Sequence, residues 1–244
     1  MKDSDKHRKY ELIGKCLYFP SLKTLVIGDL HLGYETMLKK QISIPFNQTK
    51  KTLDELKAVL DYLAENKKDV KKIILLGDIK HYFSFNQEEE NSVNRIIEFL
   101  REKAEVICIR GNHDKMKIAG INFQDFYVKN NIAFIHGHKA FNEIYDKNIN
   151  IIVMGHIHPT IILKDKQKIK AEKYKCFLVG RWKGKEVIIL PSFSFITEGV
   201  SFNNFIAEHE DDVSIVPNKK IEEFEVFVPN GFEVLSFGKM RDLN

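Results

Sequence analysis

The chain has 244 residues, of which 43% are hydrophobic and 30% are charged, and its formal net charge is +4. This length and apolar content are enough to bury a sizeable core, and α/β domains commonly reach this size, so we expect one domain over residues 1–244. The small positive charge permits a nucleic-acid partner but is too small to indicate one by itself.

Apolar periodicity predicts alternating strands and helices in the first half of the chain. A helix is expected over residues 49–66, with Asn47 as its N-cap. Its apolar residues have the spacing of a helix with one buried face; they are Leu53, Leu56, Leu60 and Leu63. The other elements expected here are strands at 24–27, 72–76 and 105–109 and a helix at 87–103. This βαβ rhythm predicts a parallel sheet with right-handed crossovers.

The second half of the chain changes character, because strands follow one another without a long helix between them. The expected strands are residues 132–135, 149–154, 160–163, 173–179, 186–190 and 225–228. Alternating side chains and tight connections such as residues 182–185 favour antiparallel pairing. A second sheet is therefore predicted.

Histidine-rich phrases close five of the apolar runs, and together they hold seven of the nine histidines. They are Gly28-Asp29-Leu30-His31, Gly77-Asp78-Ile79-Lys80-His81, Gly111-Asn112-His113-Asp114, His136-Gly137-His138 and Gly155-His156-Ile157-His158. Open parallel sheets usually bind their ligands beyond the carboxyl ends of the strands. Imidazole, carboxylate and amide groups without thiolate suit divalent manganese, iron, cobalt and zinc. The phrases therefore indicate a metal centre, in which two ions could share one carboxylate, and Asp78 is our choice for it.

In their order, these phrases resemble the five signatures of the calcineurin-like metallophosphoesterase superfamily. The first two phrases are more narrowly similar to the small archaeal SbcD-related phosphoesterases. The similarity spans roughly residues 20–160 and extends more loosely to about 200. It implies an α/β fold, a two-sheet αββα sandwich with mixed parallel and antiparallel strands, helices outside and metals at one end.

The resemblance also implies a ligand set for two divalent ions. One metal would be held by Asp29, His31, the shared Asp78 and His158, and the other by Asp78, Asn112, His136 and His156. Manganese is the usual choice of the family, with iron, zinc, nickel and cobalt as alternatives. His113 would stay off the metals and face the substrate, and Asp114 would orient its ring.

Two further histidines bear on the site: His81 on the class of substrate, and His138 as an alternative to His136. Many relatives have aspartate where this chain has His81, and the relatives with histidine include SbcD-type DNA nucleases, in which it lies beside the substrate. His81 therefore favours a phosphodiesterase or nuclease. His136 is the predicted ligand, whereas His138 is the alternative ligand or a neighbour of the site. His7 and His209 lie outside every phrase and are predicted to be surface residues.

Two later stretches have two readings each. Lysines and arginines crowd residues 164–185, with Tyr174 and Trp182 among them. They could bind a phosphate backbone and stack a base, or they could be the lysines that keep edge strands from associating. The phenylalanines after residue 192 could form a core, or an exposed subset could dock a helicase or a second copy of the chain in a homodimer.

We therefore expect a two-metal phosphoesterase that hydrolyses phosphodiester bonds, as a nuclease acting on nucleic acid. The resemblance links such proteins with DNA-repair helicases or ligases. One alternative is hydrolysis of a small or cyclic-nucleotide phosphodiester. The other is a metal-binding scaffold that docks a repair partner without turnover.

Compartment and redox state follow from simpler signals. The first ten residues lack an apolar segment, and no window approaches 18 uninterrupted apolar residues, so a cytoplasmic protein without a membrane span is expected. Cys16, Cys108 and Cys176 lie far apart within apolar runs and are predicted to be buried thiols.

Overall fold

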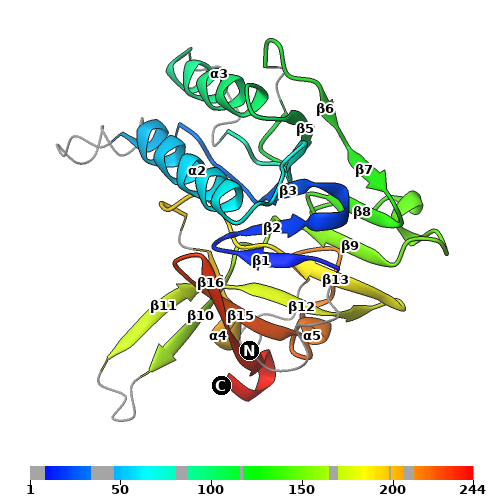
Figure 1. Ribbon diagram of the computed structural model, residues 1–244. Coiled ribbons are helices and arrows are strands. Elements are labelled where there is room, and N and C mark those ends of the chain that lie inside the picture. Colours follow the sequence, from blue (N-terminus) through cyan, green and yellow to red (C-terminus); the bar gives the residue numbers. More distant parts are fainter. Residues whose placement is uncertain are drawn as a thin grey trace.

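A computed structural model describes residues 9–33, 47–80, 87–115, 118–164, 170–197, 199–205 and 212–243. Two large sheets face each other in this part of the chain, with the long helices on the outer side of one sheet and short helices on the outer side of the other (Figure 1). The predicted α/β sandwich with mixed parallel and antiparallel strands is confirmed.

The first sheet has the strand order β1-β2-β3-β4-β5-β6. Its strands are β1 (Glu11–Ile13), β2 (Cys16–Phe19), β3 (Thr24–Ile27), β4 (Lys72–Leu75), β5 (Glu105–Ile109) and β6 (Phe123–Gln124). From β3 to β6 the neighbours are parallel, whereas β1, β2 and β3 are antiparallel. The crossovers contain α2 (Gln48–Glu65) and α3 (Gln87–Arg101). The side chain of Asn47 accepts a hydrogen bond from the Lys50 N–H at 2.7 Å, as expected of an N-cap.

The second sheet has the strand order β16-β15-β12-β13-β9-β8-β7. Its strands in chain order are β7 (Phe126–Lys129), β8 (Ile132–Ile135), β9 (Ile151–Met154), β12 (Phe177–Trp182), β13 (Lys185–Ile189), β15 (Glu225–Asn230) and β16 (Glu233–Lys239). The pairs of β9 with β8 and with β13 are parallel, and the other pairs are antiparallel.

A small third sheet corrects one sequence prediction. The strand expected over residues 173–179 is divided into β11 (Ala171–Lys175) and β12, which belong to different sheets. The break lies at buried Cys176, whose N–H donates to the carbonyl of Pro159. In the small sheet β11 pairs with β10 (Pro159–Lys164), which also pairs with β14 (Val200–Ser201).

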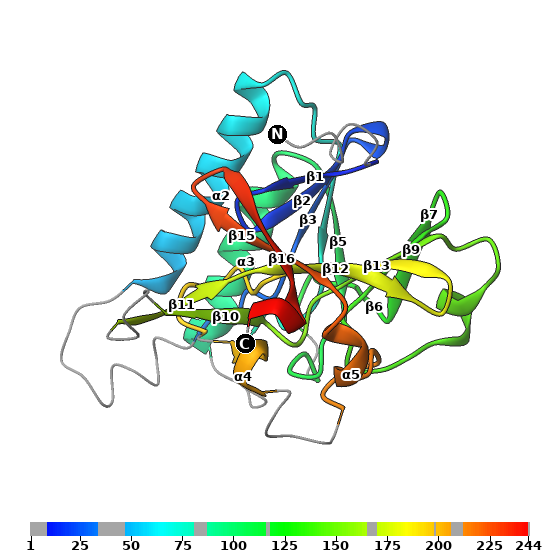
Figure 2. The same ribbon diagram turned by 90° about the horizontal axis from the view of Figure 1, so that it is seen from below.

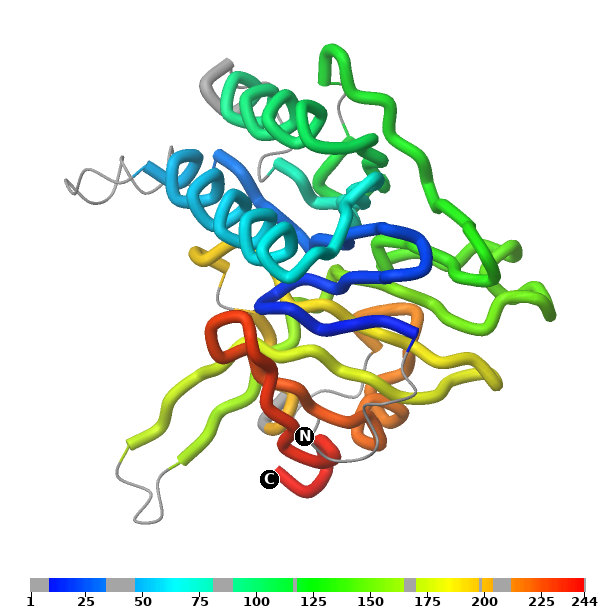
Figure 3. Tube along the Cα trace, viewed as in Figure 1, coloured from blue at the N-terminus to red at the C-terminus, as the bar shows by residue number. Residues whose placement is uncertain are grey.

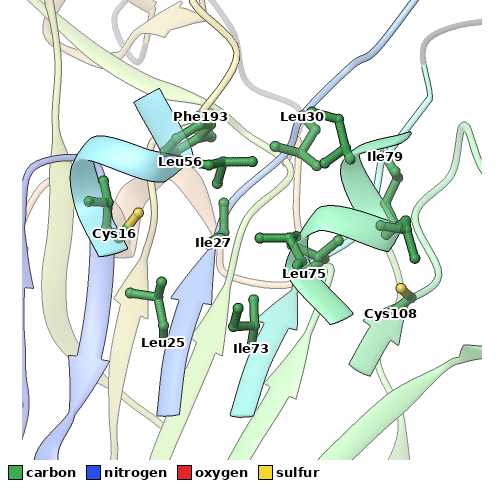
Figure 4. Close-up of a cluster of buried hydrophobic side chains, with 14 of the residues drawn as sticks. Cys16, Leu25, Ile27, Leu30, Leu56, Ile73, Leu75, Ile79, Cys108 and Phe193 are labelled. Atoms are coloured by element: carbon green, nitrogen blue, oxygen red, sulfur yellow. The ribbon is translucent and has the colours of Figure 1, made fainter. Parts of the chain in front are cut away.

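Buried apolar side chains fill three layers. Between the two sheets, Phe19 and Val26 of the first pack with Phe134 and Ile188 of the second. The layer between the first sheet and the long helices is drawn in Figure 4, where Leu56 of α2 lies beside Phe193 and above Ile27. Because β3 is buried on both faces, Leu25, Val26 and Ile27 form a continuous apolar run.

The third layer covers the outer face of the second sheet. It includes Phe202 of α4 (Phe202–Phe205) and Ile221 of α5 (Asn218–Ile221). The remaining short helices are η2 (Pro20–Leu22), η3 (Asn142–Tyr145) and η4 (Met240–Leu243). Four of the late phenylalanines are buried, namely Phe193, Phe202, Phe224 and Phe227. Of the two readings of this stretch, core packing is therefore correct for these side chains.

The lysine-rich stretch does not form one surface among its described residues. Lys164, Lys170 and Lys173 lie on the β10–β11 hairpin, whereas Lys183 lies at the β12–β13 turn. Figures 1 and 2 show these two hairpins pointing to opposite ends of the molecule. Lys183 packs over the ring of Trp182 with a distance of 4.6 Å from Nζ to the centroid.

The described cysteines are all buried and free, as predicted. None of the described helices has the length and apolar character needed to cross a membrane.

Candidate metal centre

The histidine-rich phrases meet at one end of the sandwich, because each follows the carboxyl end of a parallel strand. Asp29 and His31 follow β3, Asp78 follows β4, and Asn112 follows β5, all in the first sheet. His136 follows β8, and His156 and His158 follow β9, both in the second sheet. Residues separated by more than 120 positions therefore come into contact.

One ligand group contains Asp29, His31 and His158, whose potential ligand atoms all lie within 4.8 Å of one another. The Nε2 atoms of His31 and His158 are 3.1 Å apart, and His158 Nε2 is 3.3 Å from Asp29 Oδ1. Asp29 is fully buried. Among the described residues its Oδ1 has no hydrogen-bond donor. A buried carboxylate oxygen that faces imidazole nitrogens without accepting a hydrogen bond fits a cation ligand.

A second group contains Asp78, His136 and His156, again with their potential ligand atoms within 4.8 Å. His136 Nε2 lies 3.4 Å from Asp78 Oδ2 and 3.0 Å from Asn112 Oδ1. The predicted amide ligand therefore reaches the same point as the histidine and the carboxylate.

Asp78 lies between the two groups. Its Oδ2 atom, 3.4 Å from His136 Nε2 in the second group, is also 3.9 Å from His31 Nε2 in the first. A carboxylate in this position can serve two ions at once, which fits the two-metal arrangement. The residues present therefore fit a pair of divalent cations.

Main-chain carbonyls select which imidazole nitrogen faces the centre. The Nδ1 atom of His136 donates to the Leu76 carbonyl at 2.8 Å, which leaves Nε2 toward Asp78. The Nε2 atom of His156 donates to the Val213 carbonyl at 3.1 Å, which leaves Nδ1 for a ligand. Such carbonyl partners commonly orient metal-binding histidines. Neither carbonyl could be identified from the sequence, because nothing in a side-chain pattern marks a carbonyl.

The local backbone is strained at four of the predicted ligands. Their φ angles are positive: 44° for His31, 45° for Asp78, 74° for His156 and 44° for His158. This conformation is uncommon outside glycine and costs of order 1–3 kcal/mol per residue. Hydrogen bonds to the carboxylates help to hold it, since Asp29 Oδ2 accepts from the His156 N–H at 3.2 Å.

Two motif glycines allow the carboxylates to approach the main chain. A Cβ at Gly111 would lie 2.1 Å from Asp78 Oδ1, and a Cβ at Gly155 would lie 2.4 Å from Asp29 Oδ2. Any larger residue at these positions would displace a predicted ligand. Steric contact with a carboxylate thus explains why glycine occupies these two positions.

The pKa values of the metal-free site favour cation binding. Burial alone would raise the pKa of Asp29, but the imidazoles of His158 and His136 outweigh it and hold this pKa well below its usual range. Burial lowers the pKa of His31 to about 3 and that of His156 to about 4. At neutral pH Asp29 is therefore ionised and these two imidazoles are neutral, as metal ligands must be.

His136 behaves differently. Burial alone would lower its pKa, but the charges of Asp29 and Asp78 raise the pKa to about 9. Without a metal this imidazole acts as the cation between two buried carboxylates.

His113 lies beside the two groups and belongs to neither of them. Its ring packs edge-on against His31, with centroids 5.3 Å apart, and its Nε2 is 3.9 Å from Asp78 Oδ2. The side chain is 23% exposed, so it is accessible to a substrate while touching the centre.

The Asp114 side chain binds main-chain N–H groups of two loops. Its buried carboxylate accepts hydrogen bonds from the N–H groups of Gly111, Ile79 and Lys80 at 3.0 to 3.4 Å. It therefore joins the loops after β4 and β5. Burial raises the pKa of Asp114 to about 6. Its predicted part in orienting the His113 ring stays a prediction.

The remaining predicted residues have different outcomes. His81 lies outside the described residues, as do His7 and His209. His138 is exposed, with its ring 5.1 Å from that of His136, and it belongs to neither ligand group. The structure thus brings His136, rather than His138, to the centre.

Comparisons with known proteins agree with this geometry. Residues 22–176 match the family model of the calcineurin-like phosphoesterases. No curated protein matches the chain. Among solved structures, the Pseudomonas putida nuclease MPE is similar with a TM-score of 0.61 and 20% identity, over 93% of this chain and 94% of that chain. At this identity the likeness shows a shared fold.

Two further solved structures are more distant. Vps29 from Entamoeba histolytica, complexed with zinc, gives a TM-score of 0.35 and 18% identity over 86% of this chain and 88% of that chain. A predicted phosphoesterase from Streptococcus pneumoniae gives a TM-score of 0.32 and 12% identity over 88% of this chain and 97% of that chain.

Proposed function

Since the chain belongs to the calcineurin-like phosphoesterase family, we propose that it hydrolyses phosphodiester bonds with two divalent cations and that its substrate is nucleic acid. The observation that carries this proposal is the position of Asp78, whose Oδ2 faces His31 of one ligand group and His136 of the other. When bound, two cations would polarise the phosphate and lower the pKa of water.

The chain's own residues would orient and protonate the substrate. His113 is partly exposed beside the shared carboxylate and lies in neither ligand group, and we propose that it donates a proton to the leaving oxygen. The main-chain N–H of His113 donates a hydrogen bond to the side-chain Oδ1 of Asp78 at 2.8 Å, which fixes His113 relative to the ligands. His81 is proposed as a second substrate contact, on the resemblance alone.

Two observations support nucleic acid as the substrate. The Pseudomonas putida protein whose fold is similar is a nuclease. In addition, β10 starts directly after His158, so the β10–β11 hairpin begins at the metal centre and extends away from it with exposed Lys164 and Lys173 (Figure 1). Lysines along such an arm can contact a phosphate backbone.

We propose manganese as the working ion and the cytoplasm as the location. A DNA-repair helicase is the proposed partner. Phe193, Phe202, Phe224 and Phe227 are buried, so a helicase or a second copy in a homodimer would not dock on these side chains.

The test compares substrates with manganese-reconstituted protein. Bis-p-nitrophenyl phosphate, its monoester analogue, cyclic nucleotides and labelled single- and double-stranded DNA are incubated with wild type and with His113→Ala. We expect manganese-dependent cleavage of the diester and of DNA. The variant should keep its metals and lose roughly 10²–10⁴-fold in kcat on DNA, the usual contribution of a general acid to the departure of a basic leaving oxygen.

Other outcomes identify the alternatives. Cleavage of cyclic nucleotides without cleavage of DNA would replace the nucleic-acid substrate with a small diester. Bound manganese without turnover of any diester would contradict the proposed enzyme and favour the scaffold.

A further inference from the structure

The main-chain carbonyl of Asp29 receives an unusual number of hydrogen bonds. The Ser192 hydroxyl donates to it at 3.0 Å, the Phe193 N–H at 3.0 Å and the Ser194 N–H at 3.1 Å. The donors come from one short segment that follows β13 (gold in Figure 3). Gly28 permits this approach, because a Cβ there would lie 2.4 Å from the Pro191 carbonyl oxygen.

Lysine ammonium groups hold the other side of that segment. Lys175 Nζ donates to the carbonyl of Ser192 at 3.1 Å and to the carbonyl of Ser194. Lys15 Nζ donates to the carbonyl between them, that of Phe193, at 2.6 Å. The Phe193 ring is fixed in the core beside Leu56 (Figure 4). The carbonyls of residues 192–194 therefore bind lysines, while donors of the same residues bind the carbonyl of Asp29.

Lys175 is the member of this arrangement with the highest desolvation cost. Burial and the nearby charge of Lys15 lower the pKa of its ammonium to about 7. A partly buried amine of this kind is retained only where its hydrogen bonds offset the cost of removing it from water. Its partners are carbonyls of the segment that fixes a predicted ligand.

We propose that Lys175 is a positioning residue of the metal centre, which fixes residues 192–194 and through them the place of Asp29. The proposal rests on the two-metal site of the proposed function, but it does not depend on nuclease activity or on the identity of the substrate. Partners beyond the ligands commonly change metal affinity by 10- to 100-fold when they are removed.

The chain offers a matched control in Lys185. Its side chain is buried, and like Lys175 it donates to two main-chain carbonyls, those of Asp146 at 2.6 Å and Ile149 at 2.7 Å. These carbonyls precede β9, whereas the metal centre follows it, so Lys185 performs the same task at the other end of the second sheet. Lys175→Met and Lys185→Met therefore remove similar interactions, and only the former concerns the metal centre.

The experiment measures two properties of both variants. Hydrogen exchange of the Phe193 and Ser194 amides is followed in metal-free protein, and manganese affinity is measured by calorimetry. We expect faster exchange of these amides and at least about tenfold weaker manganese binding in Lys175→Met. In Lys185→Met both should stay within twofold of wild type.

Several results would overturn the proposal. Manganese affinity in Lys175→Met equal to that in Lys185→Met would do so, as would unchanged exchange of the two amides. If wild type itself binds no manganese, the proposed function fails, while amide exchange still decides whether Lys175 holds the segment. If Lys175→Met does not fold, Ser192→Ala provides the same comparison, because it removes one hydrogen bond to the Asp29 carbonyl and leaves Lys175 in place. A smaller loss of manganese affinity is expected of it.

Discussion

Buried imidazoles in the metal centre resist protonation, and this resistance weakens the metal-free protein at acid pH. Burial is the first cause of the pKa of about 3 at His31 and of about 4 at His156. An unfolded histidine has a pKa of about 6.5. Between these values the unfolded chain binds protons that the folded chain does not, so stability is lost as the pH falls below 6.5. His136, with its pKa of about 9, stays protonated in the folded chain, so it opposes this loss only near pH 6.5, where the unfolded imidazole is partly neutral. Asp114, with its pKa raised to about 6, binds its proton first in the folded chain and opposes the loss at lower pH, but His31 and His156 together outweigh it.

We therefore expect the free energy of unfolding of metal-free protein, measured with urea in the presence of a chelator, to fall from pH 6.5 to pH 4.5. This free energy should fall less steeply in His156→Gln, because the variant lacks one of the two buried imidazoles that stay neutral in the folded chain. The difference in slope should approach about 1.4 kcal/mol per pH unit for one titrating group. Equal slopes in the two proteins would contradict the assignment of His156 as a buried neutral imidazole.

Single residues also show what a sequence can and cannot reveal about the site. The predicted ligands lie in short phrases with recognisable side chains, and the described ones come together as expected. Lys175 and Ser192 lie outside every phrase and act through main-chain carbonyls, and the bond from Ser192 joins residues 163 positions apart. Contacts of this kind depend on how distant segments pack, which no local pattern encodes.

Among the elements, the turns that follow the parallel strands shape the centre. They combine positive φ at the ligands with glycines at the closest approaches. A methyl group at Gly155 would collide with Asp29 Oδ2, whereas one at Gly180 would collide with the Phe224 ring at 2.1 Å, in the outer core of the second sheet. Neither glycine has a positive φ, so alanine tests the collision alone.

Gly155→Ala should bind manganese at least about tenfold more weakly, since displacing Asp29 removes a ligand from its position. Gly180→Ala should lower the melting temperature at least as much as Gly155→Ala does, and it should leave manganese affinity within twofold of wild type. Calorimetric titration and thermal unfolding of both variants provide the comparison. Wild-type manganese affinity in Gly155→Ala would show that Asp29 is not placed as described.

Element boundaries were predictable where apolar runs are long and isolated. Strand β3 and strand β5 have the expected bounds, and both long helices are present. The β1–β2 hairpin was not predicted, and the break at Cys176 was missed because residues 173–179 contain no glycine, proline or other turn residue to mark it. That break depends on a hydrogen bond to Pro159, which is a tertiary contact.

At the scale of the whole molecule, both sheets contribute to each ligand group. Asp29 and His31 of the first sheet meet His158 of the second, and Asp78 of the first meets His136 and His156 of the second. The apolar layer between the sheets brings the two halves of the site together. The sequence predicts both sheets, but their order and face-to-face packing follow from long-range contacts that only the structure shows.

The account depends most on a pair of cations that share Asp78. Crystals grown with excess manganese and measured at the manganese absorption edge test this directly. We expect two anomalous peaks about 3.5–4 Å apart, on either side of the Asp78 carboxylate, one near Asp29, His31 and His158 and the other near Asn112, His136 and His156. A single peak, or peaks away from Asp78, would contradict the two-metal centre.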